Sequence, residues 1–150
     1  MLPASIKWLA AALLIAPGVA DARDWRLISL TREAAMFIDA DRMEADATPY
    51  PHGWVLVVMP PGRTRFVAME AHLEFDCAGH RRHGLAGLGY DQAGAILTEA
   101  AVESVWNPVP PGTLFSRSED ALCGRYVLPA RSYGSDLPIS EGLDAMKALG

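Results

Sequence analysis

The stretch RFVAMEAHLEFDC, residues 65–77, has the clearest secondary-structure pattern in the chain and decides the fold. Apolar and mostly polar residues alternate along it, which is the period-two pattern of a β-strand. One set of alternate residues, which ends in Cys77, is apolar, and we expect that face to lie in a core. The other set includes Glu70, His72 and Glu74, and we expect that face to lie mostly in water. Because Cys77 belongs to the apolar set, its disulfide is expected under the sheet rather than at the rim.

The preceding run WVLVVM, residues 54–59, is continuously apolar, which is typical of a central strand. Pro60, Pro61 and Gly62 end this run and turn the chain back, so the two strands are expected to form an antiparallel hairpin. Similar patterns, including a glycine-rich one expected to carry a bulge or a bend, predict strands at residues 25–30, 35–38, 82–90 and 95–106. The last of these also fits a helix face, and we favour a strand because its neighbours are strands.

A short helix is expected after the proline-rich stretch NPVPPG, which must be extended. Ser116 and Glu119 have the spacing of a capping box, and Thr113 is an alternative, earlier cap. Gly124 suits the position after a helix, so the helix is expected to end near Cys123. The fold class that follows is α+β: mainly antiparallel β-sheet with one short packed helix and one disulfide.

The first 22 residues have the three parts of an export signal. Lys7 is a short positive region, residues 8–16 are apolar, and ADA at 20–22 has the A-x-A form of a cleavage site. Cleavage after Ala22 leaves Arg23 as the new N-terminus. The apolar run is too short for a membrane span of about 20 residues, and no cysteine stands at the cleavage point for lipidation. We therefore expect a periplasmic or secreted protein, not a lipoprotein, with no transmembrane segment after signal cleavage.

The chain has 150 residues, 51% of them apolar, and a net charge of −5. Its length fits one domain and its composition is globular, while the acidic balance argues against nucleic acid and anionic lipid as partners. In the oxidising compartment that an exported chain reaches, two cysteines usually pair. Cys77 and Cys123 allow one intramolecular bridge, worth about 4 kcal/mol in the loop-closure model. The alternatives are a catalytic thiol and a metal ligand.

Residues with catalytic or metal-binding chemistry give weaker signals. The acidic residues of 39–46 lack the glycine and glutamate that an EF-hand calcium loop requires. His72, His80 and His83 could supply imidazole ligands for zinc or copper near Cys77, but that thiol would have to be reduced. No serine, histidine and acid have a recognisable catalytic arrangement, so we predict no enzymatic activity and no cofactor. A small hydrolase is the lowest-ranked alternative.

A spaced set of aromatic residues, glycines and both cysteines runs through residues 25–124. Its members are, in order, Trp25, Phe37, Ile38, Asp39, Met43, Trp54, Asp76, Cys77, Arg82, Tyr90, Gly94, Trp106, Pro111, Gly112, Thr113 and Cys123. This set resembles the surface-adhesin protein E family of small exported bacterial domains. The resemblance implies an antiparallel sheet with a short packed helix, a disulfide between the matching cysteines, a bacterial envelope setting and, for the namesake, attachment to host proteins.

These observations divide the chain into a signal peptide at 1–22, a surface-adhesin protein E-like domain at 23–124 and a C-terminal tail at 125–150. The tail begins as an extended linker and has the pattern of a short helix over residues 140–149, with apolar residues on one side: Leu143, Met146 and Leu149.

The leading functional hypothesis is a non-catalytic exported binding or envelope-structural module; the family resemblance adds adhesion to host or envelope proteins, to which no surface of this chain is assigned. Trp25, Trp54 and Trp106 are expected to pack in the core, because buried tryptophans contribute large apolar area. The alternative is that one of them is an exposed anchor for a partner. A second hypothesis, from a different class, is a periplasmic metal-handling protein that uses the three histidines named above.

Overall fold

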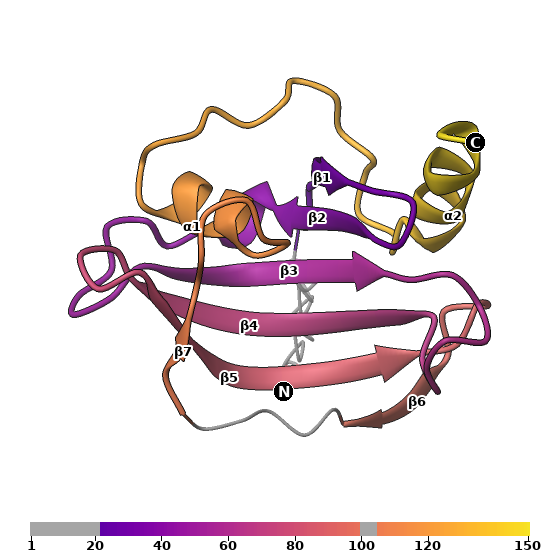
Figure 1. Cartoon of the computed structure of the whole chain (residues 1–150), viewed down its shortest axis with the longest axis horizontal. Coiled ribbons are helices and arrows are strands. Elements are labelled where there is room, and N and C mark those ends of the chain that lie inside the picture. Colours follow the sequence, from indigo (N-terminus) through magenta and orange to yellow (C-terminus); the bar gives the residue numbers. More distant parts are fainter. Residues whose placement is uncertain (1–21, 100–104) are drawn as a thin grey trace, which may run out of the picture.

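The computed structural model describes residues 22–99 and 105–150 (Figure 1). The expected signal peptide lies outside them except for its last residue, as does part of the 95–106 segment. Within the described residues, seven strands form one antiparallel sheet in the order β1-β2-β3-β4-β5-β6, and β7 pairs with β5. The strands are β1 Trp25–Leu30, β2 Ala35–Asp39, β3 His52–Val58, β4 Ala68–Asp76, β5 Arg81–Tyr90, β6 Ile96–Glu99 and β7 Asn107–Pro108. The predicted antiparallel architecture is confirmed.

The stretch that decided the fold forms β4, and the run before it forms β3. The two strands pair from His52 opposite Glu74 to Val58 opposite Ala68, so the expected hairpin is confirmed. β4 begins three residues later than the alternating pattern, at Ala68. The residues between the strands include the predicted proline and glycine turn, in which Gly62 has a positive φ of 90°.

The glycine-rich β5 has the expected irregularity. Its register against β4 shifts between His72 and Leu73, which indicates a bulge in the ladder. Gly89 has a second role, because a Cβ atom there would lie 2.4 Å from the ring of Phe66. A side chain at this position would therefore displace the Phe66 ring from the surface of the sheet.

Each face of the sheet packs against one helix, because alternate residues of a strand point to opposite sides. The first face, here the α1 face, packs against α1 (Ser116–Leu122) through buried residues that include Met36, Ile38, Val55, Val57, Leu73, Phe75, Ala121 and Leu122. The opposite face, here the α2 face, packs against α2 (Ile139–Ala148) through buried residues that include Trp25, Phe37, Leu56, Val58, Ala68, Ile139, Leu143 and Met146. The expectation that one face lies mostly in water is therefore wrong where α2 covers the sheet.

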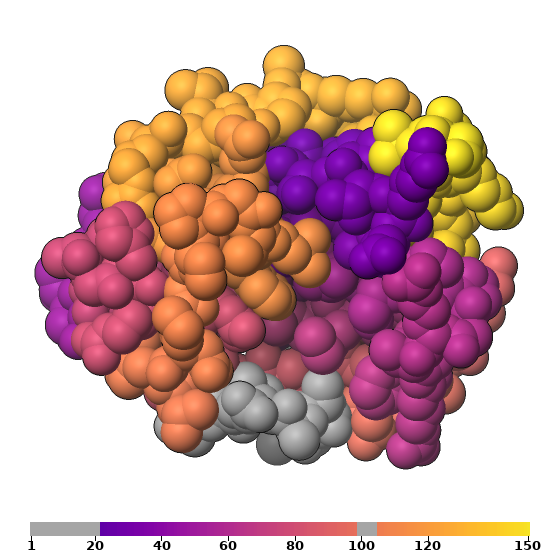
Figure 2. Space-filling view, in the orientation of Figure 1, coloured from indigo at the N-terminus to yellow at the C-terminus, as the bar shows by residue number. Residues whose placement is uncertain are grey.

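The C-terminal tail is part of the fold, so the sheet has two packed helices rather than one. Figure 1 shows an extended segment that arches from α1 to α2, and Figure 2 shows this segment and α2 bordering the β1–β2 hairpin. The backbone of Trp25 makes two hydrogen bonds with the tail: its amide N–H donates to Gly134 O at 3.1 Å, and its carbonyl oxygen accepts from Tyr133 N at 2.9 Å. Of the apolar residues on one side of the predicted helix, Leu143 and Met146 are buried, whereas Leu149 is 43% exposed. Neither of these helices, within the part of the chain that is described, is long and apolar enough to cross a bilayer.

Helix α1 differs from the sequence prediction at its N-terminus and agrees with it at its C-terminus. Phe115 precedes it without a side-chain cap, so the predicted capping box is wrong. The Ser116 hydroxyl donates to Thr113 O at 2.7 Å, and Glu119 bonds to residues outside the helix. The predicted C-terminus is confirmed, since Gly124 follows the helix with a φ of 76°.

Candidate functional site

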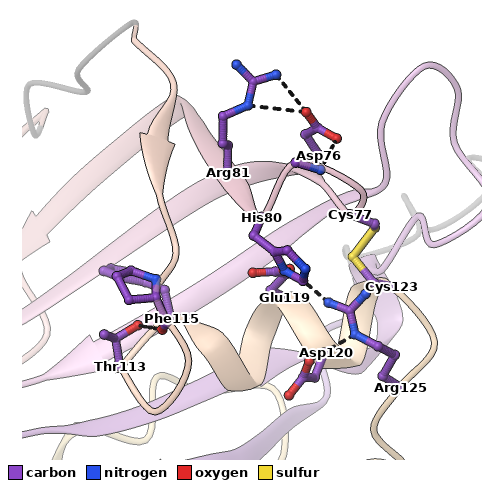
Figure 3. A network of polar contacts seen from close by, with 12 residues as sticks. Asp76, Cys77, His80, Arg81, Thr113, Phe115, Glu119, Asp120, Cys123 and Arg125 are labelled. Carbon is purple, nitrogen blue, oxygen red and sulfur yellow. Dashed lines mark hydrogen bonds and ion pairs between the residues drawn. A yellow bond between two sulfur atoms is a disulfide. The ribbon is translucent and has the colours of Figure 1, made fainter.

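Cys77 and Cys123 form the expected disulfide, which joins the turn after β4 to the residue after α1 (Figure 3). Their Cα atoms lie 5.8 Å apart. Both residues are half-buried, and Cys77 lies one position beyond the end of β4. The strand ends there because the chain turns: Asp76 Oδ1 accepts from Gly79 N at 2.9 Å. The bridge therefore lies at the end of the strand, and the expectation that it lies under the sheet is wrong.

Glu119 is the centre of a polar network beside this disulfide (Figure 3). Its side chain is 3% exposed. His80 Nδ1 donates to Glu119 Oε1 at 2.7 Å, and Arg125 Nη2 donates to the same oxygen at 2.8 Å. Arg125 also donates through Nε to Asp120 at 3.1 Å. Because His80 follows Cys77 in the β4–β5 turn, this turn is attached to α1 both by the disulfide and by the His80–Glu119 pair.

A cavity of about 140 Å³ opens next to the network, and its walls include His80, Ser116 and Glu119. These are the three residue types of a hydrolase triad. The Ser116 hydroxyl, however, donates to the backbone oxygen of Thr113, and Nδ1 of His80 is bound to Glu119. The hydroxyl is therefore directed to a carbonyl group rather than to a base. We assign this cluster to holding the hairpin turn against α1.

A second cluster lies on the α2 face, near the His52 end of β3, whereas Gly142 of α2 packs against Val58 at the other end. We name it the aromatic–histidine face, and it consists of Tyr50, His52, Trp54, His72, Glu74, His83 and Trp106. All seven residues are half-buried. Strand register brings them together, because Trp54 lies opposite His72, and Glu74 lies opposite both His52 and His83.

One ring stack of this face is built on β3 and β4. The Trp54 and His72 rings are stacked, with centroids 4.8 Å apart and planes at 10°. His52 Nδ1 lies 2.9 Å from His72 Nε2, so one imidazole donates to the other. The Arg42 guanidinium lies 4.6 Å from the Trp54 ring centroid. Burial lowers the pKa of His72 below its usual value, and the neighbouring charges of His52 and Arg42 lower it further.

The other stack is built around Trp106, which precedes β7. Its ring lies 5.2 Å from the His83 ring at an interplanar angle of 27°, and 4.8 Å from Tyr50 in an edge-to-face arrangement. The Arg81 guanidinium lies 5.3 Å from its centroid. His83 Nδ1 also donates to Glu74 Oε1 at 2.7 Å. Three distant segments of the chain therefore meet at one tryptophan.

The three tryptophans do not share one environment. Trp25 is fully buried, which confirms its expected place in the core. Trp54 and Trp106 are half-buried and stack with imidazole rings at the surface, so their expected core positions are wrong. Trp54 and Trp106 therefore reach the surface, which the alternative of an anchor for a partner requires, and Trp25 does not.

A buried ionic cluster adjoins the aromatic–histidine face on the same side of the sheet. Asp39 and Glu70 are 0% and 1% exposed, and Arg42 donates to both, at 2.7 Å from Glu70 Oε1. The Tyr90 hydroxyl donates to Glu70 Oε2 at 2.6 Å, and Arg23 lies 3.8 Å from Glu70. Burial and the Glu70 carboxylate raise the pKa of Tyr90 to about 12. The expectation that Glu70 faces water is wrong, because Arg42 supplies a charged partner that makes its burial tolerable.

The predicted metal-binding histidines are not brought together. His80 pairs with Glu119 beside α1, whereas His72 and His83 lie on the α2 face with other partners. Among the residues that the structure describes, no three or more His, Cys, Asp or Glu side chains are grouped to hold a metal ion. The Cys77 sulfur is bound in the disulfide, so it is not available as a ligand.

Sequence reasoning missed Tyr50, His52 and Arg42, which contribute to the aromatic–histidine face or lie beside it. The spacing of His52 and Trp54 contained a signal, because two residues apart in a strand share a face. Arg42 had no such signal, since its contact with Glu70 joins residues 28 positions apart.

The comparison with known proteins gives one family match. A family model described as surface-adhesin protein E matches residues 25–124. The matched region begins with β1 and ends just after α1, so it contains the sheet, both cysteines and the aromatic–histidine face. No curated protein and no solved structure gives a significant match.

Proposed function

This chain belongs to the surface-adhesin protein E family, and from that premise we propose that it is an exported, non-catalytic adhesion module. In this proposal a signal peptide at 1–22 directs the chain to the periplasm or the cell exterior, and the aromatic–histidine face binds a host or envelope protein. Residues 23–124 form the binding domain, and the tail at 125–150 completes its packing.

The observation that carries the proposal is the half-buried state of Trp54, Trp106 and Tyr50 on a sheet face that α2 leaves partly open. Tryptophan, tyrosine and arginine are the residues most enriched at the energetic centres of protein interfaces. Rings of this size lose little side-chain entropy on binding when neighbouring rings already hold them in place. The stacks with His72 and His83 fix two of these rings in that way.

The polar network beside the disulfide is less suited to binding a partner protein than the aromatic–histidine face. Glu119 has two hydrogen-bond partners, His80 and Arg125, and the Ser116 hydroxyl is bound to a backbone oxygen. These groups already have partners within the chain, which favours a structural role. A binding surface needs groups that can exchange water for a partner at small cost, and the rings of the aromatic–histidine face meet that requirement better.

The test uses residues 23–150 in oxidised form, immobilised on beads, and measures adhesion to cultured epithelial cells and to purified extracellular-matrix proteins. We expect Tyr50→Ala combined with Trp106→Ala to reduce the number of bound beads at least tenfold. Arg117→Ala is the matched control, because Arg117 stacks on Tyr126 beside α1, away from this face. An equal loss in the control, or no adhesion by the parent chain to any surface, would contradict the proposal.

A further inference from the structure

His52 and His72 place two imidazole nitrogens, which are common ligands of transition metals, at hydrogen-bond distance from each other on the aromatic–histidine face. Nδ1 of His52 and Nε2 of His72 lie 2.9 Å apart. The two residues lie on adjacent antiparallel strands and project from the same side of the sheet, His72 being opposite Trp54 in the register. Stacking against Trp54, at 4.8 Å and 10°, holds the His72 ring in position.

The spacing of the two nitrogens selects a coordination geometry. A metal ion bound by imidazole lies about 2.0–2.1 Å from each nitrogen, so two nitrogens 2.9 Å apart subtend about 90° at the ion. A tetrahedral ion such as zinc requires about 109°, which corresponds to nitrogens roughly 3.3 Å apart. Adjacent positions around a square-planar or tetragonal ion match 90°, and nitrogen and oxygen ligands in that geometry favour Cu(II) or Ni(II).

We propose that His52 Nδ1 and His72 Nε2 form a two-histidine site for Cu(II). Copper is favoured over nickel because divalent ions of this row bind a given nitrogen site most tightly at copper. The ion takes the place of the proton that lies between the two rings. The ring that held this proton exchanges it through solvent onto its other nitrogen, and each ring tilts so that its lone pair meets the ion. Both imidazoles are then neutral, each with its one proton on the nitrogen that faces away from the ion, so binding releases no net proton.

The surroundings of the pair set the expected strength of binding. Glu74 and His83 are hydrogen-bonded to each other, and no group of three metal-binding side chains occurs in the described residues. Water or a donor from another molecule therefore occupies the other positions, and the affinity is lower than that of a site with three or four protein ligands.

The copper site uses residues of the proposed adhesive surface, but it does not depend on adhesion. The probe is Cu(II) alone, without any partner protein. A negative result in this experiment therefore contradicts only the copper site, and a negative adhesion experiment contradicts only the adhesive function. Residues 23–150 are titrated with a copper(II) salt at neutral pH, and tryptophan fluorescence reports binding because Trp54 stacks on His72. Electron paramagnetic resonance of the parent complex counts the coordinating imidazole nitrogens independently of any variant.

We expect one bound Cu(II) with two imidazole nitrogens. His52→Gln and His72→Gln should each weaken binding at least tenfold, and His80→Gln should leave it unchanged because His80 pairs with Glu119 beside α1. Zinc should bind at least tenfold more weakly than copper. Unchanged affinity in both glutamine variants, which would indicate binding at the N-terminal amine, would overturn the proposal. So would a spectrum without imidazole nitrogens, or zinc binding as tight as that of copper.

Discussion

The substitution Arg42→Met tests the buried ionic cluster beside the aromatic–histidine face. Arg42 donates to Asp39 and Glu70, which are 0% and 1% exposed, and its guanidinium lies 4.6 Å from the Trp54 ring. Methionine retains most of the apolar stem that covers Trp54 but removes the positive charge. Both carboxylates would then lose their main partner while they remain buried.

Removal of one partner from a buried ion pair costs about 3–5 kcal/mol. Arg42 is 22% exposed, which reduces the electrostatic part, but two carboxylates are affected instead of one. We therefore expect the free energy of unfolding to fall by about 3 kcal/mol, a large share of the roughly 5–15 kcal/mol of a typical domain. With a slope of about 2 kcal/mol per molar urea, the unfolding midpoint would fall by about 1.5 M.

The assay is urea unfolding of oxidised residues 23–150 at neutral pH, followed by circular dichroism. The matched control is Arg26→Met, because the partner of Arg26, Asp24, is about a fifth exposed rather than fully buried, and we expect a clearly smaller loss of stability. Adding Glu70→Gln to Arg42→Met should restore part of the stability, since it removes one uncompensated charge. Equal losses in the two methionine variants would refute the reasoning.

Three further predictions concern the disulfide and the titrating groups. Replacing both Cys77 and Cys123 by alanine should lower the melting temperature by roughly 15 °C, because the bridge closes a loop with a sequence separation of 46; a calorimetric shift of only a few degrees would contradict this. The pKa of Tyr90 is raised to about 12 by burial and by Glu70, so the folded state holds the phenol proton more tightly, and stability should fall as the pH rises from about 10 to 12. Tyr90→Phe should remove that alkaline loss in urea titrations. The pKa of His72 is lowered by burial, so its contribution to the free energy of unfolding is complete above about pH 6.5 and is lost as the pH falls below that value. His72→Gln should therefore weaken the fall of stability at acid pH in urea titrations, and an unaltered dependence on pH would contradict the lowered pKa of His72.

The strands could be predicted from the sequence because their signals are local. Alternation in residues 65–77 and the apolar run before it specify β4 and β3, and the Pro60-Pro61-Gly62 turn specifies their pairing. The pairing of the other successive strands then follows from the short segments that connect them, because strands joined by short connections are usually neighbours in a sheet. The resemblance to a known family also located the sheet and the disulfide correctly, and the family model matches residues 25–124.

The surroundings of the strands could not be predicted in the same way. Alternation assigns Glu70 and Trp54 to a face, but it does not say which other segment covers that face. α2 and Arg42 decide the outcome for the α2 face, and both arrive from outside the β3–β4 hairpin. Glu70 is therefore buried with a partner, whereas Trp54 remains half-exposed.

The capping box failed because a local interaction competed with a tertiary one. Glu119 has the spacing to bond the start of α1, but His80 and Arg125 offer charged donors at 2.7 and 2.8 Å. Hydrogen bonds between charged groups are roughly twice as strong as those between neutral groups. A spacing rule that considers only one helix does not include these distant donors.

The position of the disulfide has a mechanical consequence for a protein of an adhesin family. Tension applied between the N-terminal strand and α2 would pass from β4 through the two sulfur atoms to the segment that leads to α2. The chain between Cys77 and Cys123, which contains β5, β6, β7 and α1, would carry none of that force while the bond is intact. The two cysteines are 46 residues apart in the sequence, so the intact disulfide prevents roughly 150 Å of chain from being extended by the force. Reduction of one covalent bond would therefore lengthen the tether that this domain provides.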